Sequence, residues 1–324
     1  MKSEFKIAVV GPIPQDTIKT HKNETILKYG CVTHPTVALA KLMEGEGIVV
    51  PISNVHKNDI EPIHELFKGF EVIVKNGISA EKDAGTIIEL NFIDQNNRLE
   101  KQISNMSPIS AVEIRPFLEA DCFVFVPITD FEIDISALQL IKNKSDARII
   151  FDAHGPTTYV TDKGQRLRRY WADREEWFPY IDVLKMNLEE SLCCWFNRDH
   201  NDLSNFDEND TAHLEDFANY ILGQGVAYLY VTLDSRGCAI YSRKDGEVVH
   251  EFVKSVSVKD VIDTTGCGDS FAGGLAYGFT KYNDHIKAAH FANTLGALRT
   301  QGKGFDVFKT LEATEKIIAA NYYK

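Results

Sequence analysis

Asp263-Thr264-Thr265-Gly266-Cys267-Gly268-Asp269-Ser270-Phe271-Ala272-Gly273-Gly274 is the most informative stretch of the chain. It follows a valine-rich run, residues 256–262, whose composition predicts a strand. It also opens an apolar segment, residues 271–279, that is long enough for about two helical turns. The pattern therefore predicts a strand, a tight glycine turn and the start of a helix.

The small residues at 266–268 give this predicted helix start an open backbone. Glycine permits a tight turn and leaves neighbouring N–H groups uncovered. Uncovered N–H groups at a helix N-terminus, with the helix dipole behind them, attract an anion or a developing negative charge. Asp269 falls in the first turn beside that place, where a carboxylate can orient and deprotonate a hydroxyl. The combination suggests phosphoryl transfer.

Other interpretations of the same stretch remain open on the residues alone. Asp269 is also a good first-turn residue that would simply stabilise its helix. A dinucleotide-binding loop is disfavoured, because Phe271 stands where the third glycine of Gly-x-Gly-x-x-Gly belongs and because an aspartate would face the pyrophosphate. A Walker P-loop is excluded, since the sequence contains no Gly-Lys-Ser or Gly-Lys-Thr.

Composition places the chain among ordinary globular proteins. It has 324 residues, of which 44% are hydrophobic and 25% charged, and its formal net charge is −12. A strongly acidic protein is a poor general binder of nucleic acid or of an anionic membrane, so a phosphate site has to be local. We expect no nucleic-acid partner and no membrane partner.

The cysteines and the N-terminus predict a cytoplasmic location. No run of 18 apolar residues and no secretory signal are visible. The cysteines lack Cys-x-x-Cys spacing, which favours buried free thiols in a reducing compartment. They are Cys31, Cys122, Cys193, Cys194, Cys238 and Cys267.

Most of the chain alternates between predicted strands and predicted helices. This alternation predicts a parallel sheet covered by helices. The predicted strands are residues 5–10, 48–52, 72–74, 122–126, 149–151, 181–186 and 227–232, followed by a β-rich stretch, 238–258. The predicted helices are residues 36–43, 60–67, 135–141, 188–196, 212–222, 266–277, 285–298 and 309–320.

Two segments interrupt the alternation. Residues 86–93 and 98–106 alternate loosely around a turn at 94–97, which predicts an antiparallel hairpin, and Thr25–Tyr29 could add a strand to it. Such a small sheet needs a cover, either a substrate or a second subunit, unless it is a surface hairpin without a role. Residues 154–179 show no regular pattern, and the function of their Arg- and Trp-rich part, 166–177, stays open.

Asn187-Leu188-Glu189-Glu190 lies between a predicted strand and a predicted helix. Asn is a favoured N-cap, and Glu three positions later completes a capping box. The pattern by itself is therefore explained as a helix start.

The string 263–271 closely resembles the C-terminal motif of the ribokinase (phosphofructokinase-B, PfkB) family of sugar and nucleoside kinases, which usually has alanine where Cys267 stands. The resemblance implies a single domain, 1–324, with a Rossmann-like, mostly parallel central sheet flanked by helices. It also implies a small β-sheet lid from roughly 12–30 and 85–107. In that family Asp269 would be the catalytic base, and the backbone N–H groups of Gly266, Cys267 and Gly268 would form the anion hole.

The resemblance also implies sites for the nucleotide and for cations. The Asn-x-x-Glu motif places Asn187 and Glu190 where they would organise Mg²⁺ indirectly, which suits an ion that keeps several of its waters. Asp263 and the Thr265 carbonyl match a monovalent-cation site, with K⁺ as the candidate ion. The positions that match the family's nucleotide-binding residues are Thr232, Asp234 (often glycine in the family), Gly237 and Asn293.

The acceptor side matches the family less well. The family carries a carboxylate at Asp16 that accepts hydrogen bonds from sugar hydroxyls, and Asp152 falls near the substrate and the phosphates. The family's Gly-Gly pair followed by an asparagine is reduced here to Gly30, with His34 about where the asparagine belongs. His34 could contact the substrate or merely cap its helix.

The activity implied is transfer of the ATP γ-phosphoryl group to a hydroxyl of a sugar, polyol or nucleoside. A nucleoside (adenosine-like) kinase is the alternative within this chemistry. A non-catalytic sugar- or nucleoside-binding regulator on the same scaffold is the alternative outside it. The exposed edge of the lid favours a homodimer formed through the lid.

Overall fold

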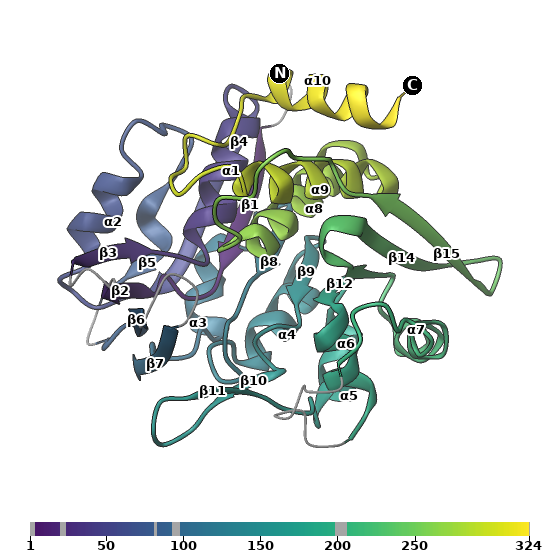
Figure 1. Cartoon of the computed structure of the whole chain (residues 1–324), viewed down its shortest axis with the longest axis horizontal. Helices are drawn as coiled ribbons and strands as arrows, with labels where there is room; N and C mark the ends of the chain where they lie inside the picture. The colour runs from purple at the N-terminus through teal and green to yellow at the C-terminus, as the bar shows by residue number, and fades with distance from the viewer. Residues whose placement is uncertain (1–3, 20–23, 81–82, 93–97, 198–205, 324) are drawn as a thin grey trace.

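The computed structural model describes residues 4–19, 24–80, 83–92, 98–197 and 206–323 (Figure 1). Within these residues the chain forms a nine-stranded central sheet, a separate four-stranded sheet and a two-stranded hairpin. Helices cover both faces of the central sheet, so the predicted α/β class is confirmed. No helix of the described part is long and apolar enough to cross a membrane.

The central sheet has the strand order β15-β14-β13-β12-β9-β8-β1-β4-β5. Neighbours from β13 to β5 run parallel, whereas β14 and β15 are antiparallel additions at one edge. Its central strands are almost wholly buried, because helices lie on both sides. The strands are β1 (Phe5–Val10), β4 (Gly47–Asn54), β5 (Ile78–Ser79), β8 (Cys122–Phe125), β9 (Arg148–Asp152), β12 (Val183–Asn187), β13 (Tyr228–Thr232), β14 (Gly237–Lys244) and β15 (Glu247–Lys254).

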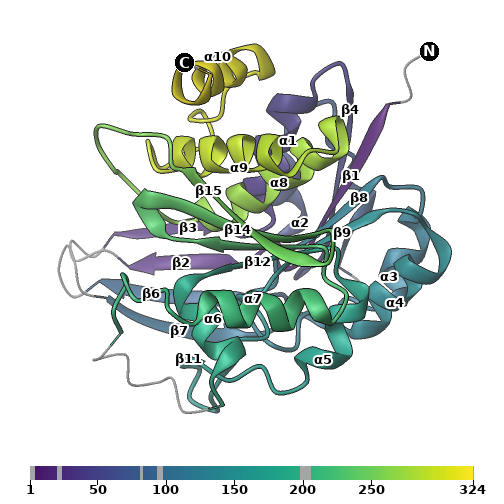
Figure 2. The ribbon, with the colours of Figure 1, turned by 90° about the vertical axis from the view of Figure 1, so that its right-hand side faces the viewer.

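Each face of the central sheet has its own hydrophobic core (Figure 2). The first core lies under α1 (Thr33–Met43), α2 (Ile60–Leu66), α8 (Cys267–Tyr282) and α9 (His285–Arg299), with α10 (Leu311–Tyr322) outside them. The second lies under α3 (Ala111–Ile114), α4 (Ile135–Lys144), α5 (Arg174–Trp177), α6 (Leu188–Trp195) and α7 (Leu214–Gly223). Short 3₁₀ turns occupy Lys75–Gly77, Arg115–Phe117, Phe178–Tyr180 and Asp234–Arg236.

Glycines in α8 let this helix pack unusually closely against α9. A Cβ atom on Gly278 would lie 2.3 Å from the Ala288 Cα, and one on Gly274 would lie 2.5 Å from the Ala292 Cα. Neither distance is compatible with a side chain, so only glycine permits this approach. The contact fixes the axis of α8 and thereby the position of its N-terminus.

The small sheet has the order β3-β2-β6-β7 and lies beside the α/β body. Its strands are β2 (Gln15–Lys19), β3 (Thr25–Tyr29), β6 (Ile87–Phe92) and β7 (Arg98–Ser104). The predicted small sheet is confirmed, although the sequence did not indicate β2. The predicted turn at 94–97 lies outside the described residues.

Register divides the side chains of the small sheet into two faces. Leu27, Thr17, Glu89 and Lys101 are successive cross-strand neighbours and therefore share one face, with Leu99 and Ile103 two positions from Lys101. We call this the outer face. The other, inner face carries Asp16, Lys28 and Glu100, and two of these contact the body: Lys28 pairs with Asp263, and Glu100 pairs with Arg166.

The predicted strand at 256–262 is wrong. β15 ends at Lys254, and the following segment has no strand neighbour, because it leaves the sheet edge to reach α8. Val261 and Ile262 are exposed, and the Ile262 N–H donates to the Thr300 carbonyl at 2.8 Å instead. A run of valines and isoleucines thus lies in an irregular connection.

Two other predictions need smaller corrections. The predicted strand at 72–74 is a single bridge between Val49 and Ile73. Residues 154–179, expected to be irregular, contain β10 (Thr158–Val160) and β11 (Arg166–Arg168), followed by α5. The two strands pair antiparallel, and we call residues 158–168 the connector hairpin.

Candidate active site

The predicted site residues gather where the parallel strands end. Asp152 is the last residue of β9, Asn187 the last of β12 and Thr232 the last of β13. In open α/β sheets, ligands bind at this edge because the loops that follow the strands surround it. The start of α8 also contacts this edge, through Gly268 and Lys185 of β12.

Gly266 starts α8 in a left-handed conformation, with φ 79° and ψ 8°. A Cβ atom at this position would lie 2.3–2.5 Å from the ring of His34. Both the left-handed conformation and this close approach therefore require glycine. The Cys267 N–H donates to the Thr264 carbonyl at 3.2 Å. Among the described residues, no backbone carbonyl accepts from the N–H groups of Gly266, Gly268 or Asp269. Two of the three predicted anion-hole donors are therefore free of backbone acceptors, and Cys267 is engaged.

Asp269 lies in the first turn of α8 and is partly buried. Burial raises the pKa of its carboxyl to about 6, against the lowering effect of the Lys185 charge. The Cys31 thiol lies 3.9 Å from Asp269 Oδ1. A carboxylate with a pKa near neutrality, next to open N–H groups, suits a general base.

Lys185 is a site residue that the sequence interpretation missed. Its Nζ lies 2.7 Å from Asp152 Oδ2, and a Cβ atom on Gly268 would lie only 3.1 Å from it. Burial lowers the pKa of Lys185, but the Asp152 and Glu190 carboxylates outweigh this effect and hold it above its usual value. A charged ammonium therefore faces the open N–H groups of α8. The available signal was a lysine inside the otherwise apolar strand 183–186.

Asp152 is buried and forms the other half of this ion pair. Burial raises the pKa of Asp152 to about 7, although the Lys185 charge opposes the shift. The backbone N–H of His154 donates to its second oxygen at 3.1 Å. Asp152 thus holds Lys185 at the site rather than lying free in it.

Asn187 and Glu190 form the predicted capping box at the start of α6. The Asn187 backbone N–H donates to Glu190 Oε2 at 2.8 Å, while Oε1 accepts from Asn187 Nδ2, His154 Nδ1 and Arg168 Nη2. Burial raises the pKa of Glu190, but the His154 hydrogen bond and the Arg168 charge outweigh it and hold the pKa well below its usual range. Glu190 is therefore an ionised carboxylate at 1% exposure.

These contacts decide how Glu190 could serve a divalent metal. The described residues contain no group of three or more His, Cys, Asp or Glu side chains arranged to hold a metal ion directly. Oε2 accepts one hydrogen bond, from the Asn187 N–H, whereas Oε1 accepts three, so Oε2 is the less occupied oxygen. This arrangement fits an indirect role, in which Glu190 accepts from a water bound to Mg²⁺.

His34, Gly30 and Asp16 come together on the acceptor side. A Cβ atom on Gly30 would lie 3.4 Å from Asp16 Oδ2 and 4.0 Å from His34 Nε2. Arg299 Nε donates to His34 Nδ1 at 3.1 Å, so the ring proton is on Nε2. Burial lowers the pKa of His34 to about 3, which keeps the ring neutral. Asp16 and His34 thus offer an acceptor and a donor around a position that lacks a side chain.

Two non-glycine residues near the predicted site have left-handed backbone conformations. Cys31, which follows Gly30, has φ 47°, and Asp234, at the position that resembles a frequent glycine of the family, has φ 50°. Glycine is the default residue for this conformation, and Asp tolerates it. The backbone at Asp234 therefore has the conformation for which glycine is the usual residue.

In the predicted monovalent-cation site, the Asp263 carboxylate already has protein partners. The Asp263 carboxylate accepts from the Thr265 N–H at 3.0 Å, and its second oxygen lies 3.4 Å from Arg299 Nη2 and 3.9 Å from Lys28 Nζ. Burial raises the pKa of Asp263, but these partners outweigh it and lower the pKa. The positive charge at this carboxylate is thus supplied by the protein itself.

The predicted nucleotide-binding residues are only partly brought together. Thr232 is the cross-strand neighbour of Asn187, and Asp234 and Gly237 follow it in the turn into β14. The Asn293 amide nitrogen instead donates to the Val253 and Lys254 carbonyls, both at 3.2 Å. Asn293 therefore holds α9 against β15.

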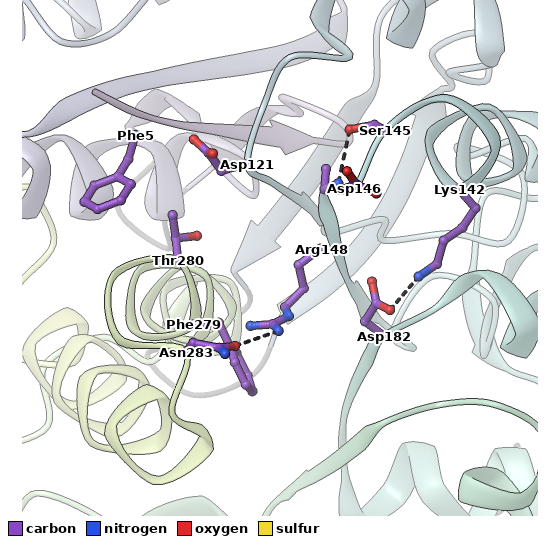
Figure 3. Close-up of a pocket in the computed structure, with 11 residues that line it drawn as sticks. Phe5, Asp121, Lys142, Ser145, Asp146, Arg148, Asp182, Phe279, Thr280 and Asn283 are labelled. Atoms are coloured by element: carbon purple, nitrogen blue, oxygen red, sulfur yellow. Dashed lines mark hydrogen bonds and ion pairs between the residues drawn. The ribbon is translucent and has the colours of Figure 1, made fainter. Parts of the chain in front are cut away.

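A separate cavity of about 550 Å³ lies at the opposite edge of the sheet. Asp121, Arg148 and Asp182 line it at or next to the starts of β8, β9 and β12 (Figure 3). Lys142 pairs with Asp182, and Arg148 donates to Asn283, so these charged groups already have partners. None of the predicted site residues lines this cavity, which we call the amino-edge cavity.

A family model for the pfkB family of carbohydrate kinases matches residues 142–309, just over half of the 324 residues. This range includes Asp152, Lys185, Glu190 and the stretch 263–274. An uncharacterized sugar kinase from Archaeoglobus fulgidus is 37% identical over 98 residues, which are 29% of this chain and 37% of the relative. The chain thus matches little more than a third of that relative's length.

Solved structures share the fold over nearly the whole chain. A ribokinase from Thermotoga maritima matches with a TM-score of 0.73 and 17% identity. The match covers 97% of this chain and 99% of the ribokinase. A Methanocaldococcus jannaschii nucleoside kinase has a TM-score of 0.69 with 17% identity, and the match covers 99% of both chains. At these identities the similarity shows the fold and leaves the acceptor open.

Proposed function

Because the chain belongs to the pfkB family of carbohydrate kinases, we propose that it transfers the γ-phosphoryl group of ATP to a hydroxyl of a sugar or polyol. The observation that carries the proposal is the grouping of Asp269, the open N–H of Gly268 and the Lys185 ammonium. A base, an anion hole and a cation at one point are the groups that phosphoryl transfer needs.

Each group has a proposed role. Asp269 orients the acceptor hydroxyl and takes its proton as the oxygen attacks. The N–H groups of Gly266 and Gly268, together with Lys185, stabilise the charge on the transferring group. Such transition states are loose, so positioning and electrostatics supply most of the acceleration. Mg²⁺ supplies charge neutralisation on the ATP phosphates when bound, and Asn187 and Glu190 would hold its water shell in place.

Polar groups on the acceptor side suit the neighbouring hydroxyls of a sugar or polyol. Asp16 accepts hydrogen bonds and His34 Nε2–H donates them, as neighbouring hydroxyls require. Phe305 packs against the His34 ring, with 5.4 Å between the ring centres, and so supports that ring. The base at Asp269 argues against a regulator without catalysis, which has no use for it.

The test is an ADP-release screen with Mg²⁺-ATP against sugars, polyols and nucleosides, with Asp269→Asn alongside. We expect one class of sugar or polyol to stimulate turnover. The variant should lose at least about 1,000-fold in kcat, because general base catalysis and hydroxyl positioning are both lost. Its ATP affinity, measured by calorimetry, should stay within about threefold, because Asp269 is assigned to the acceptor.

Three outcomes would contradict the proposal. Turnover with nucleosides alone would show that the acceptor is a nucleoside and not a sugar or polyol. Retained turnover in Asp269→Asn would remove the base assignment. Binding of a sugar, seen by thermal shift, without any turnover would establish the regulator instead.

We also propose a homodimer that forms through the outer face of the small sheet. Leu27, Leu99 and Ile103 on this face are 58%, 63% and 47% exposed. Exposed apolar side chains gathered on one face of a small sheet are typical of a covered surface. A second copy would cover this face and leave the inner face to the substrate.

A further inference from the structure

A chain of hydrogen bonds joins the small sheet to Glu190. Glu100 on β7 accepts from Arg166 Nη1 at 2.8 Å, and Arg166 Nη2 lies 3.2 Å from His154 Nε2. His154 Nδ1 in turn lies 2.8 Å from Glu190 Oε1. The four residues come from β7, the loop after β9, the connector hairpin that follows this loop, and α6. We call this chain of contacts the relay.

The chemistry of the partners fixes the direction of every hydrogen bond in the relay. A guanidinium can only donate, so His154 Nε2 must be the unprotonated nitrogen that accepts from Arg166. The neutral ring then carries its proton on Nδ1, which donates to the Glu190 carboxylate. Arg166 and Glu190 therefore require the same His154 tautomer, with the proton on Nδ1.

Arg166 is itself placed by the small sheet and by the body. Besides Glu100, it donates to the Ile128 carbonyl at 3.0 Å. The connector hairpin follows the edge of β7, where the Gln102 N–H donates to the Gly164 carbonyl at 2.8 Å. Movement of β7 away from the body would break the Glu100 contact and this backbone contact together.

We propose that His154 and Arg166 are positioning residues, which orient Glu190 according to whether the small sheet is docked on the body. The proposal rests on the proposed function, because Glu190 is assigned to the water shell of Mg²⁺. It goes further in linking the acceptor side, where the small sheet lies, to the metal side. Partners behind a metal-organising carboxylate typically change metal affinity or activity by about 10–100-fold when they are lost.

Two substitutions of His154 each remove one of its two hydrogen bonds in the relay. The amide nitrogen of asparagine lies two bonds from Cβ, as Nδ1 does, so His154→Asn keeps a donor for Glu190 and loses the Arg166 end. The amide oxygen of glutamine lies three bonds from Cβ, as Nε2 does, so His154→Gln keeps an acceptor for Arg166 and loses the Glu190 end. A merely structural histidine would tolerate both changes alike or neither.

The first measurement is ATP binding by calorimetry at increasing Mg²⁺ concentration, for the full chain and each variant. We expect His154→Gln to raise the Mg²⁺ concentration needed for half-maximal binding at least about tenfold, and His154→Asn to raise it less than about threefold. Equal effects of the two variants would overturn the assignment to Glu190.

The second measurement reads the tautomer directly, by ¹⁵N NMR of the histidine rings. The His154 signal is identified among the ten histidines as the one absent from His154→Asn. We expect the proton on Nδ1 in the wild type. In Arg166→Met and in Glu100→Ala we expect the unprotonated Nε2 signal to move downfield, because that nitrogen loses or weakens its hydrogen bond from Arg166. Leu99→Ala is the control, since Leu99 neighbours Glu100 but lies on the outer face and is 63% exposed. An unchanged Nε2 signal in both test variants would overturn the coupling to the small sheet.

Failure of the relay and failure of the kinase assignment are distinguishable. If the wild type phosphorylates an acceptor and the variants leave the His154 Nε2 signal unchanged, the kinase assignment stands and the relay is rejected. A wild type with the Nδ1 tautomer and the expected variant response, but without turnover of any acceptor, retains the contacts and rejects the kinase.

Discussion

Asp269 carries the clearest prediction at the scale of a single residue. Its pKa is raised from 3.8 to about 6, and a base acts only when it is ionised. The value of kcat/KM should therefore rise about tenfold per pH unit below pH 6 and level off above it. A profile that is flat between pH 5 and 7 would contradict the assignment.

The same pKa makes a prediction about stability. The folded state holds the Asp269 proton more tightly than the unfolded chain, so stability falls as pH rises from about 4 to about 6. At neutral pH the ionised carboxylate thus weakens the fold. Asp269→Asn should be more stable than the wild type at pH 7 by on the order of 1–3 kcal/mol, as measured by urea unfolding, while losing turnover. A less stable variant would mean that Asp269 is a helix-stabilising residue.

Substitutions at Lys185 can distinguish a role in turnover from a role in stability. Lys185→Met should reduce kcat about 100- to 1,000-fold, because it removes a cation from the transferring group. It should also lower the free energy of unfolding by on the order of 3 kcal/mol, because Asp152 is left buried without its partner.

The double variant Lys185→Met/Asp152→Asn is the matched control. It removes the unpaired charge, so the free energy of unfolding should recover while kcat should not. Recovery of both would show that Lys185 acts only through stability. Retention of kcat within about threefold in the single variant would remove it from the site.

Among single residues, the sequence predicted those with a local signature. Gly266, Asp269, Asn187 and Glu190 lie in short strings that combine a backbone requirement with a functional group. Lys185 and the Arg299–His34 contact had no such signature, because Arg299 and His34 are 265 positions apart and meet only in the fold. His34 could not be assigned from the sequence for the same reason.

At the scale of an element, the prediction concerns the end of α9 and the response of the enzyme to K⁺. Arg299 is 2% exposed and contacts Asp263 in the segment before α8, where Lys28 adds a second positive charge. Replacement of K⁺ by Na⁺ or tetramethylammonium, at constant ionic strength, should change kcat/KM less than about twofold, because the protein already supplies the charge.

Arg299→Met provides the matching variant. With the guanidinium removed, Asp263 is left with Lys28 alone, so the variant should lose turnover and recover part of it with K⁺. A more than tenfold stimulation of the wild type by K⁺ would show that the ion displaces Arg299. Lys316→Met is the surface control, because Lys316 lies on α10 and pairs with Glu312 there.

The elements themselves were largely predictable, since β1 and β3 have the expected bounds and most others differ by a few residues. Prediction from hydrophobic periodicity failed where neighbouring segments, rather than the composition of the segment itself, determine whether a strand forms. The run at 256–262 has the composition of a strand but no neighbouring strand beyond β15. β10 and β11 are short and polar, and they are stabilised by contacts with β7 and with Asp130.

At the scale of the whole molecule, the prediction concerns assembly. Sedimentation velocity should show a dimer at micromolar concentration. Leu27→Glu/Leu99→Glu should convert it to a monomer, because it places charges on the outer face. Val112→Glu is the control, since Val112 is 70% exposed on α3, away from the small sheet. A monomeric wild type would reject the dimer.

The relation between the two sheets could not be predicted from the sequence. Alternating elements indicated the body, and the hairpin pattern indicated a second sheet. The inner face was not predictable, because it depends on β2, whose sequence Gln-Asp-Thr-Ile-Lys has little strand character. The relay likewise depends on contacts between four separate segments.

The separation of the small sheet from the α/β body also has an evolutionary consequence. Its strands come from two excursions, 15–29 and 87–104, whereas the proposed base and anion hole lie at the start of α8, held by its close contact with α9. Apart from Lys28 and Glu100, which contact the body, positions in the excursions can therefore change without disturbing the proposed machinery of transfer. New acceptors can be recruited by gene variants that alter the small sheet alone, and exchange of these two segments between homologues is a rational route to enzymes of altered preference.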